Sequence, residues 1–447
     1  MNAFIAAALL ASAPASSSTV PISLEEARTQ GRQNTNALQA LLDVQVAEED
    51  VRLSRSALLP QLSLGVSAGK VWYGRRQSFE LVPVQGGGFE QREVETPSTD
   101  TENYDLGLSL SQIIYDRARF KQLEQSGVLR DAQQSQAQEE ADTSELEAIR
   151  RFFTLFRTQA TLQVLEATVK RSEQQLERAR ALFQAGRVGK NEEISALVNL
   201  GNDRITFTET LAQLVSDQGN LAVWLARPGT EPLQAADPGV LTQEPAPAPA
   251  MDTALAEARE RRPLLKALQL QIRSAELSRA IARADYVPRL SARGDYSRGG
   301  PSAELVFTEA RLQSVFTAGI SLSWNLFNGF NTAAQARRAE AGIRRAQLIL
   351  AQSAREIEAE VRRAHRTLEA QLEAARLAAD NREAATQGLR LAEERFRAGA
   401  GSTLEVRDAQ LSLTRAELNL LENRIDVEIA RFTLMRAMGA LSPGESK

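Results

Sequence analysis

Few residues of this sequence have types and spacing that could do chemistry, and the clearest group is a pair of carboxylates near the C-terminus. Glu405 and Asp408 are three positions apart, a spacing that places both side chains on one face of a helix. On spacing alone, the pair indicates an ordinary solvated helix face beside Arg407 rather than a site for cations.

Other kinds of chemistry find little support in the composition. The chain has no cysteine, which excludes disulfides, thiolate nucleophiles and cysteine metal sites. Its single histidine, His365, lies in an Arg- and Glu-rich stretch, and we expect it on a helix surface. The sequence therefore predicts no metal centre and no cofactor.

One segment, residues 186–191, faintly resembles a phosphate-binding loop. Gln184 stands where the first glycine of that motif belongs, and Asn191 replaces the Ser or Thr. A predicted helix also precedes the segment, where the motif requires a strand. Because no nucleophile–base pair or metal cluster appears elsewhere, the sequence predicts that the protein is not an enzyme.

The N-terminus indicates export. Residues 1–15 contain a short apolar run that ends in Ala13-Pro14-Ala15, a small-x-small pattern typical of a cleaved secretory signal. No later segment approaches the ~18 consecutive apolar residues of a membrane-spanning helix. The formal net charge of the 447 residues is −4, which argues against nucleic acid as a partner. An exported chain of this kind is periplasmic, secreted or a β-barrel.

The chain also repeats itself. Leu59-Pro60-Gln61-Leu62-Ser63 resembles residues 287–291, and two further landmarks recur in the same order about 210 to 230 residues later. The first copy carries extra residues before Tyr115, including Gly86-Gly87-Gly88 and a polar run over 92–103, which predict a long solvent-exposed loop. The expected organisation is a signal peptide over 1–15, a first repeat over 16–227, a Pro-rich linker over 228–250, a second repeat over 251–439 and a tail over 440–447.

Strict alternation of apolar residues with Ser, Gly and other small polar residues predicts two strands in each repeat. Such strands have one apolar and one small polar face, which suits a soluble sandwich or a transmembrane barrel. Aromatic residues gather near these segments, as they would at a membrane interface. The four strands are expected at about 61–70, 104–114, 289–297 and 317–326.

The remaining segments predict unusually long helices. A helix precedes the strands of each repeat, and a long helix and a return helix follow them, at 116–185 and 190–226 and again at 328–398 and 403–438. A 70-residue helix spans ~105 Å, which suits coiled coils or tubes rather than a compact globule. Each return helix carries two heptad stripes on nearly opposite faces. Two opposed seams mean a neighbour on each side, and so a wall of helices.

Four strands per chain cannot close a membrane barrel, whose practical minimum is about eight strands. Strands in a membrane must also leave no open edge. The sequence therefore predicts an oligomer that shares one barrel, with a multiple of four strands.

These features, taken in order, resemble the TolC-like outer membrane factor (outer membrane efflux protein) family. The resemblance runs over nearly the whole chain, from about Ile22 to Gly439. It rests on the duplicated strand–helix units, on the proline corners before strands, on a Leu-Ser-Trp-Asn-Leu-Phe-Asn-Gly segment and on glycine hairpin tips: Pro60, Pro288, residues 322–329, Gly186 and Gly399.

The resemblance implies a mainly helical fold with transmembrane β-structure. Three chains would form a homotrimer with a shared 12-stranded barrel in the outer membrane, surrounded by its lipid, and an α-helical barrel across the periplasm. The channel would be a passive exit duct of a tripartite efflux pump or a type I secretion system. Its implied partners are a periplasmic adaptor (membrane fusion) protein and an inner-membrane pump.

The resemblance also assigns roles at the hairpin tips. Glu405 and Asp408 match two acidic residues that face the closed periplasmic gate, where three chains would form stacked acidic rings. Glu192 matches an acidic residue of the latch between chains. The latch's basic partner would fall at Gly401, so Arg187 and Lys190 are the candidate substitutes.

The two tips themselves match the surface that meets the adaptor. They are formed by Ala185 and Gly186 in the first repeat and by Ala398 and Gly399 in the second, and the glycines fit a turn between helices. The competing interpretation of the whole chain is a periplasmic coiled-coil adaptor or scaffold protein. That alternative explains the export signal and the long helices but not the four strands.

Overall fold

The computed structural model describes residues 19–241, 245–308 and 314–441, and they form two compact units. The expected signal peptide, and the end of the expected tail, lie outside the described residues. One unit comprises residues 46–130 and 270–347, and we call it the strand unit. The other comprises residues 1–45, 131–269 and 348–447, and we call it the helical unit.

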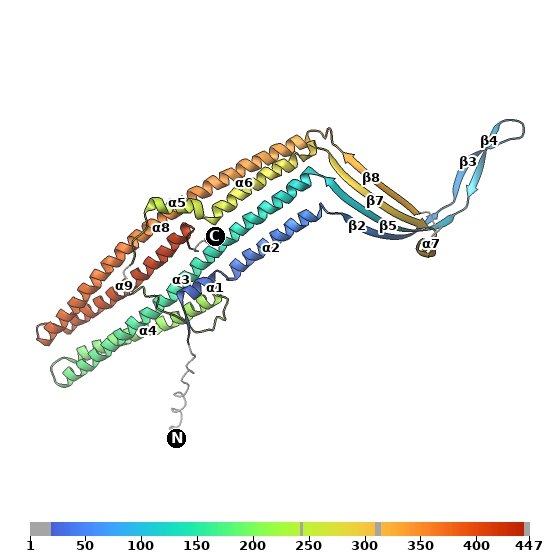
Figure 1. Ribbon diagram of the computed structural model, residues 1–447. Helices are drawn as coiled ribbons and strands as arrows, with labels where there is room; N and C mark the ends of the chain where they lie inside the picture. Colours follow the sequence, from blue (N-terminus) through green and yellow to red (C-terminus); the bar gives the residue numbers. More distant parts are fainter. Residues whose placement is uncertain (1–18, 242–244, 309–313, 442–447) are drawn as a thin grey trace, which may run out of the picture. The chain divides into compact units, whose positions relative to one another are not determined.

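The strand unit is built on a four-stranded antiparallel sheet in the order β2-β5-β7-β8 (Figure 1). Two strands come from each half of the chain, and the halves meet where β5 pairs with β7. Among the described residues, β2 and β8 each pair on one side only. The strands are β2 (Gln61–Tyr73), β5 (Thr99–Tyr115), β7 (Arg289–Gly300) and β8 (Ser314–Ser323).

The register of this sheet separates its two faces cleanly. Leu62 lies opposite Leu110, and Leu290 lies opposite Leu322, so leucines of neighbouring strands share one face. The other face carries paired serines, whose hydroxyl groups hydrogen-bond at 2.6 Å between Ser63 and Ser109 and at 2.9 Å between the Ser291–Ser321 pair. The apolar face is exposed along its length, since Leu64 and Ile320 are 67% and 71% exposed.

Two strands extend further than the alternation of apolar residues reaches. The expected ends at residues 70 and 104 are passed by β2 and β5, which pair as far as Tyr73 with Thr99. Charge replaces hydrophobicity there, because the Lys70 ammonium contacts Asp100 at 2.6 Å and Glu102 at 3.3 Å. A cross-strand ion pair stabilises a strand. It produces no alternation of apolar residues, which is the pattern from which the strand ends were predicted.

The segment between these strands is not the long loop expected from its composition. It forms a hairpin of β3 (Arg76–Pro83) and β4 (Phe89–Thr96), which continues from β2 and β5. The three glycines at 86–88, all with positive φ, make the turn. Both faces of this hairpin are largely exposed. Its strands therefore lack the alternation of apolar and polar residues from which strands are predicted.

At the other edge, β8 stops before Trp324, although the sequence indicated a strand to residue 326. Its partner β7 begins at Arg289 opposite Ser323, so later residues have no strand to pair with. The Trp324 indole Nε1 instead donates to the Tyr286 carbonyl at 3.3 Å. Phe330 has φ 66°, which a right-handed helix cannot contain, so the helix begins at 331 rather than 328.

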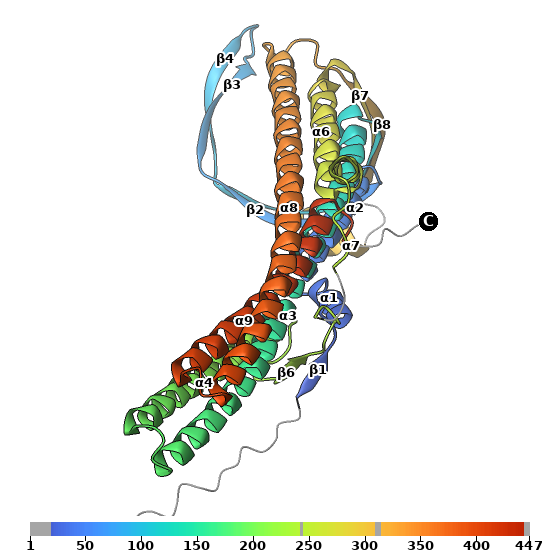
Figure 2. The same ribbon diagram turned by 90° about the vertical axis from the view of Figure 1, so that its left-hand side faces the viewer.

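Helices lie on both sides of each pair of strands in the sequence. Their bounds are α1 (Leu24–Gly31), α2 (Thr35–Ser56), α3 (Arg117–Gln184), α4 (Lys190–Trp224), α5 (Met251–Arg261), α6 (Pro263–Ala282), α8 (Asn331–Arg397) and α9 (Thr403–Ala437). A short helix α7 (Ala303–Thr308) follows β7, and a 3-10 turn covers Ala284–Tyr286. The linker is not purely irregular, because β6 (Leu233–Ala235) pairs in parallel with β1 (Val20–Ile22), as Figure 2 shows.

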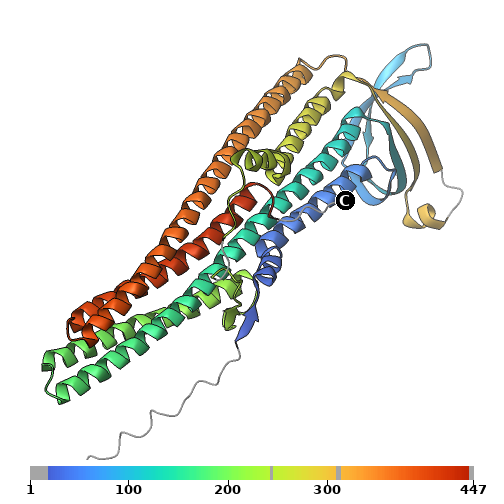
Figure 3. The same ribbon diagram turned by 60° about the vertical axis from the view of Figure 1, so that its left-hand side comes forward.

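The return helices differ in how their two apolar seams are used. On α9 both are covered within the chain, since Ile425 packs in one core with α3 and Val427 in a second core with α8. On α4 one seam is buried at Leu200 and Leu221, whereas the opposite seam is 57% exposed at Ile205. Figure 3 shows α9 beside α8, and α4 beside α3. The described part of the chain therefore covers both seams of α9, whereas it leaves the seam of α4 at Ile205 open.

Helices of the helical unit are joined by one buried and three partly buried charged residues that we call the arginine–glutamate cluster: Arg262, Arg436, Glu139 and Glu360. The Arg262 side chain is 3% exposed and contacts Glu139 at 2.9 Å and Glu360 at 3.3 Å. Arg436 contacts the same two carboxylates at 2.9 and 2.6 Å. Arg262 also donates to the last carbonyls of α9, at residues 436 and 437, which a helix end leaves unsatisfied.

His365 does not lie on a helix surface, as its charged sequence surroundings suggested. It is 5% exposed, and its Nε2 lies 2.7 Å from the Pro249 carbonyl oxygen. The reason is periodicity, because His365 follows Val361 by four residues and precedes Leu368 by three, on the buried stripe of α8. The charged residues one and two positions from His365 lie on other faces of α8, so they do not report whether His365 itself is exposed.

Removal of one arginine from the cluster should destabilise the fold strongly. Arg262→Ala removes one of the two cations that hold Glu139 and Glu360, and it leaves two helix-end carbonyls without their donor. We expect a loss of ~3 kcal/mol in the free energy of unfolding. Urea denaturation of the purified protein in detergent measures it. Arg261→Ala is the matched control, since Arg261 is 58% exposed in a pair with Glu257 at 3.6 Å and should cost under ~1 kcal/mol. Equal losses in the two variants would contradict the structural role of the cluster.

Candidate functional site

The two helical hairpins of the helical unit end in turns of the same geometry. Gly186 has φ 67° and Gly399 has φ 72°, a left-handed conformation that favours glycine. The amide of Arg187 donates to the Leu182 carbonyl, and that of Ala400 donates to the Arg395 carbonyl, both at 2.9 Å. These bonds close each helix in the same way, so the paired tips at Ala185–Gly186 and Ala398–Gly399 are equivalent positions of the two repeats.

The carboxylates at the start of α9 differ in their surroundings. The Ser402 hydroxyl caps the helix by accepting from the Glu405 amide at 3.2 Å. The Glu405 side chain is held by the Arg395 guanidinium at 3.1 Å, across its own hairpin. Asp408 is exposed, and within the described ranges its carboxylate has no ion-pair partner. The two carboxylates thus lie on a solvent-accessible face of α9, and Arg407 is turned away from this face toward Asp203.

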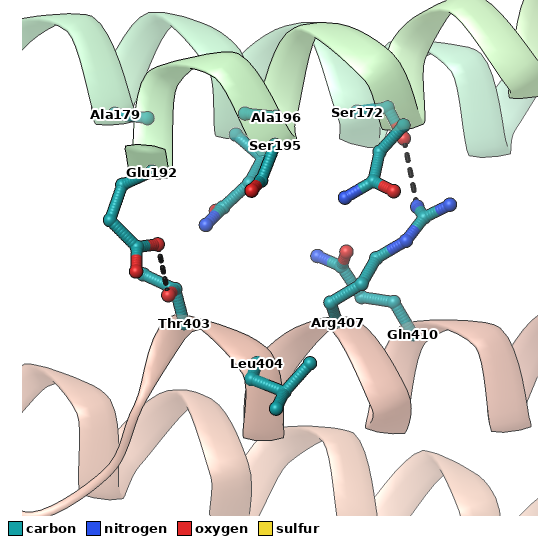
Figure 4. Close-up of a pocket in the computed structure, with 11 residues that line it drawn as sticks. Ser172, Ala179, Glu192, Ser195, Ala196, Thr403, Leu404, Arg407 and Gln410 are labelled. Carbon is teal, nitrogen blue, oxygen red and sulfur yellow. Dashed lines mark hydrogen bonds between the residues drawn. The ribbon is translucent and has the colours of Figure 1, made fainter. Parts of the chain in front are cut away.

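Two of the three latch candidates, Glu192 and Lys190, are engaged within the chain, though not with one another. Glu192 accepts a hydrogen bond from the Thr403 hydroxyl at the start of α9 (Figure 4). Lys190 contacts Glu193 at 2.6 Å, and this hydrogen bond lowers the pKa of the Glu193 carboxyl. Arg187 is exposed and has no ion-pair partner in the part of the chain that the structure describes.

Gly401, where a basic latch residue would fall, has little room for one. A Cβ atom there would lie 3.1 Å from the Phe396 nitrogen and 3.2 Å from a Glu405 carboxylate oxygen. The pair of Glu405 with Arg395 therefore occupies the space that a larger residue at 401 would need.

A line of polar side chains on α9, which we call the polar seam, faces the first hairpin: Thr403, Arg407, Gln410 and Thr414. Arg407 makes the strongest contact, because its two terminal nitrogens each donate at 3.1 Å to a different oxygen of Asp203 on α4. The two side chains are 15% and 13% exposed. Ser172 on α3 also accepts from Arg407 at 3.2 Å and donates to Asp203. A bidentate pair in this setting is stronger than a surface ion pair.

A cavity of about 270 Å³ lies inside this seam, between α3, α4 and the start of α9 (Figure 4). Glu192 and Thr403 lie at one end, and Arg407 with Ser172 at the other, as the labelled side chains show. The first hairpin and α9 are thus held together by polar contacts on both sides of this cavity. These contacts add to the apolar packing of the buried Val406 and Leu413 side chains on α9.

Asp203, Ser172 and Thr403 were missed by sequence analysis, although the sequence carries a signal for the first of them. Asp203 falls three residues after Leu200, and thus on the stripe that α4 buries against α3. A carboxylate on a buried stripe requires a partner. Nothing comparable marks Ser172 or Thr403, because small hydroxyl residues are common on helix surfaces.

The described residues show neither a metal centre nor a membrane-spanning helix. No group of three or more His, Asp or Glu side chains in ranges 19–241, 245–308 and 314–441 could hold a metal ion. Within the same ranges, every helix falls short of the apolar length needed to cross a membrane.

A family model and a related protein of known class both match most of this chain. The family model of the outer membrane efflux protein matches residues 29–226 and 254–440, once for each repeat. The outer membrane protein TolC of Vibrio cholerae serotype O1 is 24% identical over 413 residues, which cover 89% of this chain and 85% of that protein.

Solved structures of channels share the fold. The CmeC outer membrane channel of Campylobacter jejuni matches with a TM-score of 0.74 at 14% identity, covering 95% of this chain and 87% of that one. The MtrE outer membrane channel of Neisseria gonorrhoeae matches with a TM-score of 0.71 at 18% identity, covering 95% and 91%.

The fold is that of an outer-membrane channel protein made of two tandem strand–helix repeats. The chain belongs to the outer membrane efflux protein family, and its matched segments coincide with its two repeats. It is therefore an efflux channel of the TolC type that extends from the outer membrane into the periplasm, and it is not an enzyme. The scaffold interpretation of its long helices is set aside.

The Arg407–Asp203 pair should be energetically coupled. A double-mutant cycle of Arg407→Ala and Asp203→Ala isolates their interaction, which we expect to be ~1–3 kcal/mol for a desolvated bidentate pair. Urea denaturation in detergent supplies the four free energies of unfolding. The exposed pair of Arg204 with Glu173, 2.6 Å apart between α4 and α3, is the matched control and should give under ~1 kcal/mol. If the losses in free energy of unfolding for Arg407→Ala and Asp203→Ala are additive, the two side chains do not stabilise the contact between α9 and α4.

Proposed function

We propose that three copies of the chain form one channel, and that efflux substrates pass through it without energy supplied by the channel itself. The observation that carries this proposal is the open edges of the single chain. Both edge strands of the sheet and both outer helices of the helical unit present surfaces that a neighbouring copy fits.

The sheet supplies the first pair of edges. Counting along β2-β5-β7-β8, each strand is antiparallel to the next, so β8 of one copy would run antiparallel to β2 of another. The antiparallel pairing would therefore continue from one copy to the next around a ring. A membrane sheet must close, and four strands are too few. Three copies give the 12 strands that membership of the family implies.

The helices supply the second pair of edges. The open seam of α4 includes Val198 and Ile205, which are 56% and 57% exposed. On the far side of α9, the α8 surface carries Leu377 and Leu391 at 49% and 58%. In a ring of three chains these apolar surfaces would meet, completing an α-helical barrel in which each helix has two neighbours.

The hairpin tips would form the periplasmic end of this barrel. Glu405 and Asp408 of three chains would make the gate, an acidic constriction that favours cations. Glu192 would complete the latch between chains, with Arg187 or Lys190 of the next copy as its partner. Ala185, Gly186, Ala398 and Gly399 would meet an adaptor protein that connects the channel to an inner-membrane pump, for efflux or for type I secretion.

A charge placed in the open α4 seam should prevent assembly. Ile205→Glu would put a carboxylate into an apolar contact between copies, which costs several kcal/mol, so we expect at least a tenfold loss of trimer. Mass measurement by light scattering of the detergent-extracted protein checks this. Thr206→Glu adds the same charge at the adjacent exposed position and serves as control. An Ile205→Glu protein that remains as trimeric as the control would contradict the proposed contact.

Neutralising the two gate carboxylates should change ion selectivity. In planar bilayers, Glu405→Gln with Asp408→Asn should lower the preference for cations and weaken block by polyvalent cations, because the acidic rings would be lost. Asp380→Asn with Glu383→Gln, an exposed acidic pair of the same spacing on α8, is the matched control. If both double variants shift the reversal potential equally, the constriction does not lie at Glu405 and Asp408.

A further inference from the structure

We propose that arginines at the junction between strands and helices bind the anionic phosphate headgroups of membrane phospholipids. The arginine collar, as we call this set, comprises Arg55, Arg117, Arg283, Arg337 and Arg338. All five are exposed and belong to the strand unit. The proposal rests on insertion of the apolar sheet face into the outer membrane, and it adds a specific lipid partner at the periplasmic side.

A band of exposed aromatic and large apolar residues marks where the apolar sheet face ends. Trp324 and Phe327 follow β8 and are 56% and 73% exposed, and Phe330 lies 5.5 Å from Phe327 between ring centroids. Tyr115, the last residue of β5, lies 6.2 Å from the Phe120 ring on α3. Aromatic side chains in this position are typical of the boundary between hydrocarbon and headgroups.

The collar begins within this band and continues beyond it. Arg117, the first residue of α3, lies between Tyr115 and Phe120 in the sequence and shares a face of the helix with Phe120, one turn farther along α3. Arg283 follows α6 and precedes the exposed Tyr286 by three residues, and Arg55 precedes the exposed Leu59 by four. Each of these three arginines thus has an exposed aromatic or aliphatic residue within four positions of it in the sequence.

The two arginines on α8 complete the set from the fourth helix. Arg337 and Arg338 lie about 9–10 Å along α8 from its start at Asn331. A headgroup layer is roughly 5–8 Å thick, and a long arginine side chain can reach back toward it. Ala336 is buried, and Arg338 lies nearly on the opposite face of α8. The Arg338 side chain therefore faces away from the neighbouring helices.

These arginines have no carboxylate partner among the residues that the structure describes, while the nearby carboxylates are occupied. Asp116 is buried and caps α3 by accepting from the Ala118 amide at 2.9 Å. Asp285 contacts Arg289 at 3.5 Å, and Glu340 contacts Arg344 at 4.0 Å. The strand–helix junction therefore carries positive charge that the chain does not neutralise.

Phospholipid phosphate is the partner that this arrangement fits. The guanidinium group binds phosphate oxygens in a bidentate manner, and basic residues next to a membrane attract anionic lipid over neutral lipid. The junction is continuous with the surface that proposed insertion places in lipid, so headgroups are the anions within reach. The attraction should weaken in high salt, as expected for exposed charges.

The test measures lipid preference at the strand unit directly. The full-length trimer is reconstituted in phosphatidylcholine vesicles with a rising share of phosphatidylglycerol whose acyl chains carry bromine, which quenches tryptophan fluorescence. We expect the wild type to prefer phosphatidylglycerol by at least about fivefold, and Arg117→Gln with Arg283→Gln and Arg338→Gln to remove most of that preference. Replacement of the same three arginines by lysine should keep most of it, because the charge remains.

Arg178→Gln with Arg382→Gln and Arg390→Gln removes as many exposed charges from the helical unit and should leave the preference unchanged. An equal loss in this control, or a wild type that binds both lipids alike, would overturn the collar. Competition by free inorganic phosphate at matched ionic strength would show an anion site without lipid selectivity and would also overturn it. A wild type that fails to enter phosphatidylcholine vesicles would instead refute insertion of the sheet, and the collar with it.

Discussion

The arginine–glutamate cluster is the constraint on which the arrangement of the helical unit depends. Arg262 and Arg436 share Glu139 and Glu360, so four charges from α3, α8, α9 and the α5–α6 junction satisfy one another. Buried charges tolerate few alternatives, because any other arrangement of these elements leaves a charge unpaired.

The position of α9 explains why the candidate site lies where it does. The cluster fixes its C-terminal end, two apolar cores hold its middle, and toward the tip the hydrogen bonds of the polar seam stand beside the buried Val406 and Leu413. Polar contacts therefore make up a larger share of the packing toward Glu405 and Asp408. If these residues form the proposed gate, opening it would break mainly hydrogen bonds.

Much of this fold could be predicted from the sequence, because periodicity reports on burial. The apolar alternation of β2 reflects one apolar face, and the two heptad stripes of α9 reflect contacts on two sides of the helix. Prediction failed where charge took the place of hydrophobicity, as at Lys70 with Asp100, and where no face is buried, as in the β3–β4 hairpin. The site was only partly predictable, since a pair such as Arg407 with Asp203 joins residues from different repeats that sequence spacing does not relate.

The same pair has a consequence for the symmetry of motion. Arg407 belongs to the second hairpin, whereas Asp203 and Ser172 belong to the first, so the two hairpins of one chain are mechanically linked. The proposed trimer would have six hairpins and, because the repeats are duplicated, approximate sixfold order at its tip. With the two hairpins of each chain coupled, they would move as three units, and a gate between them would widen with threefold rather than sixfold symmetry.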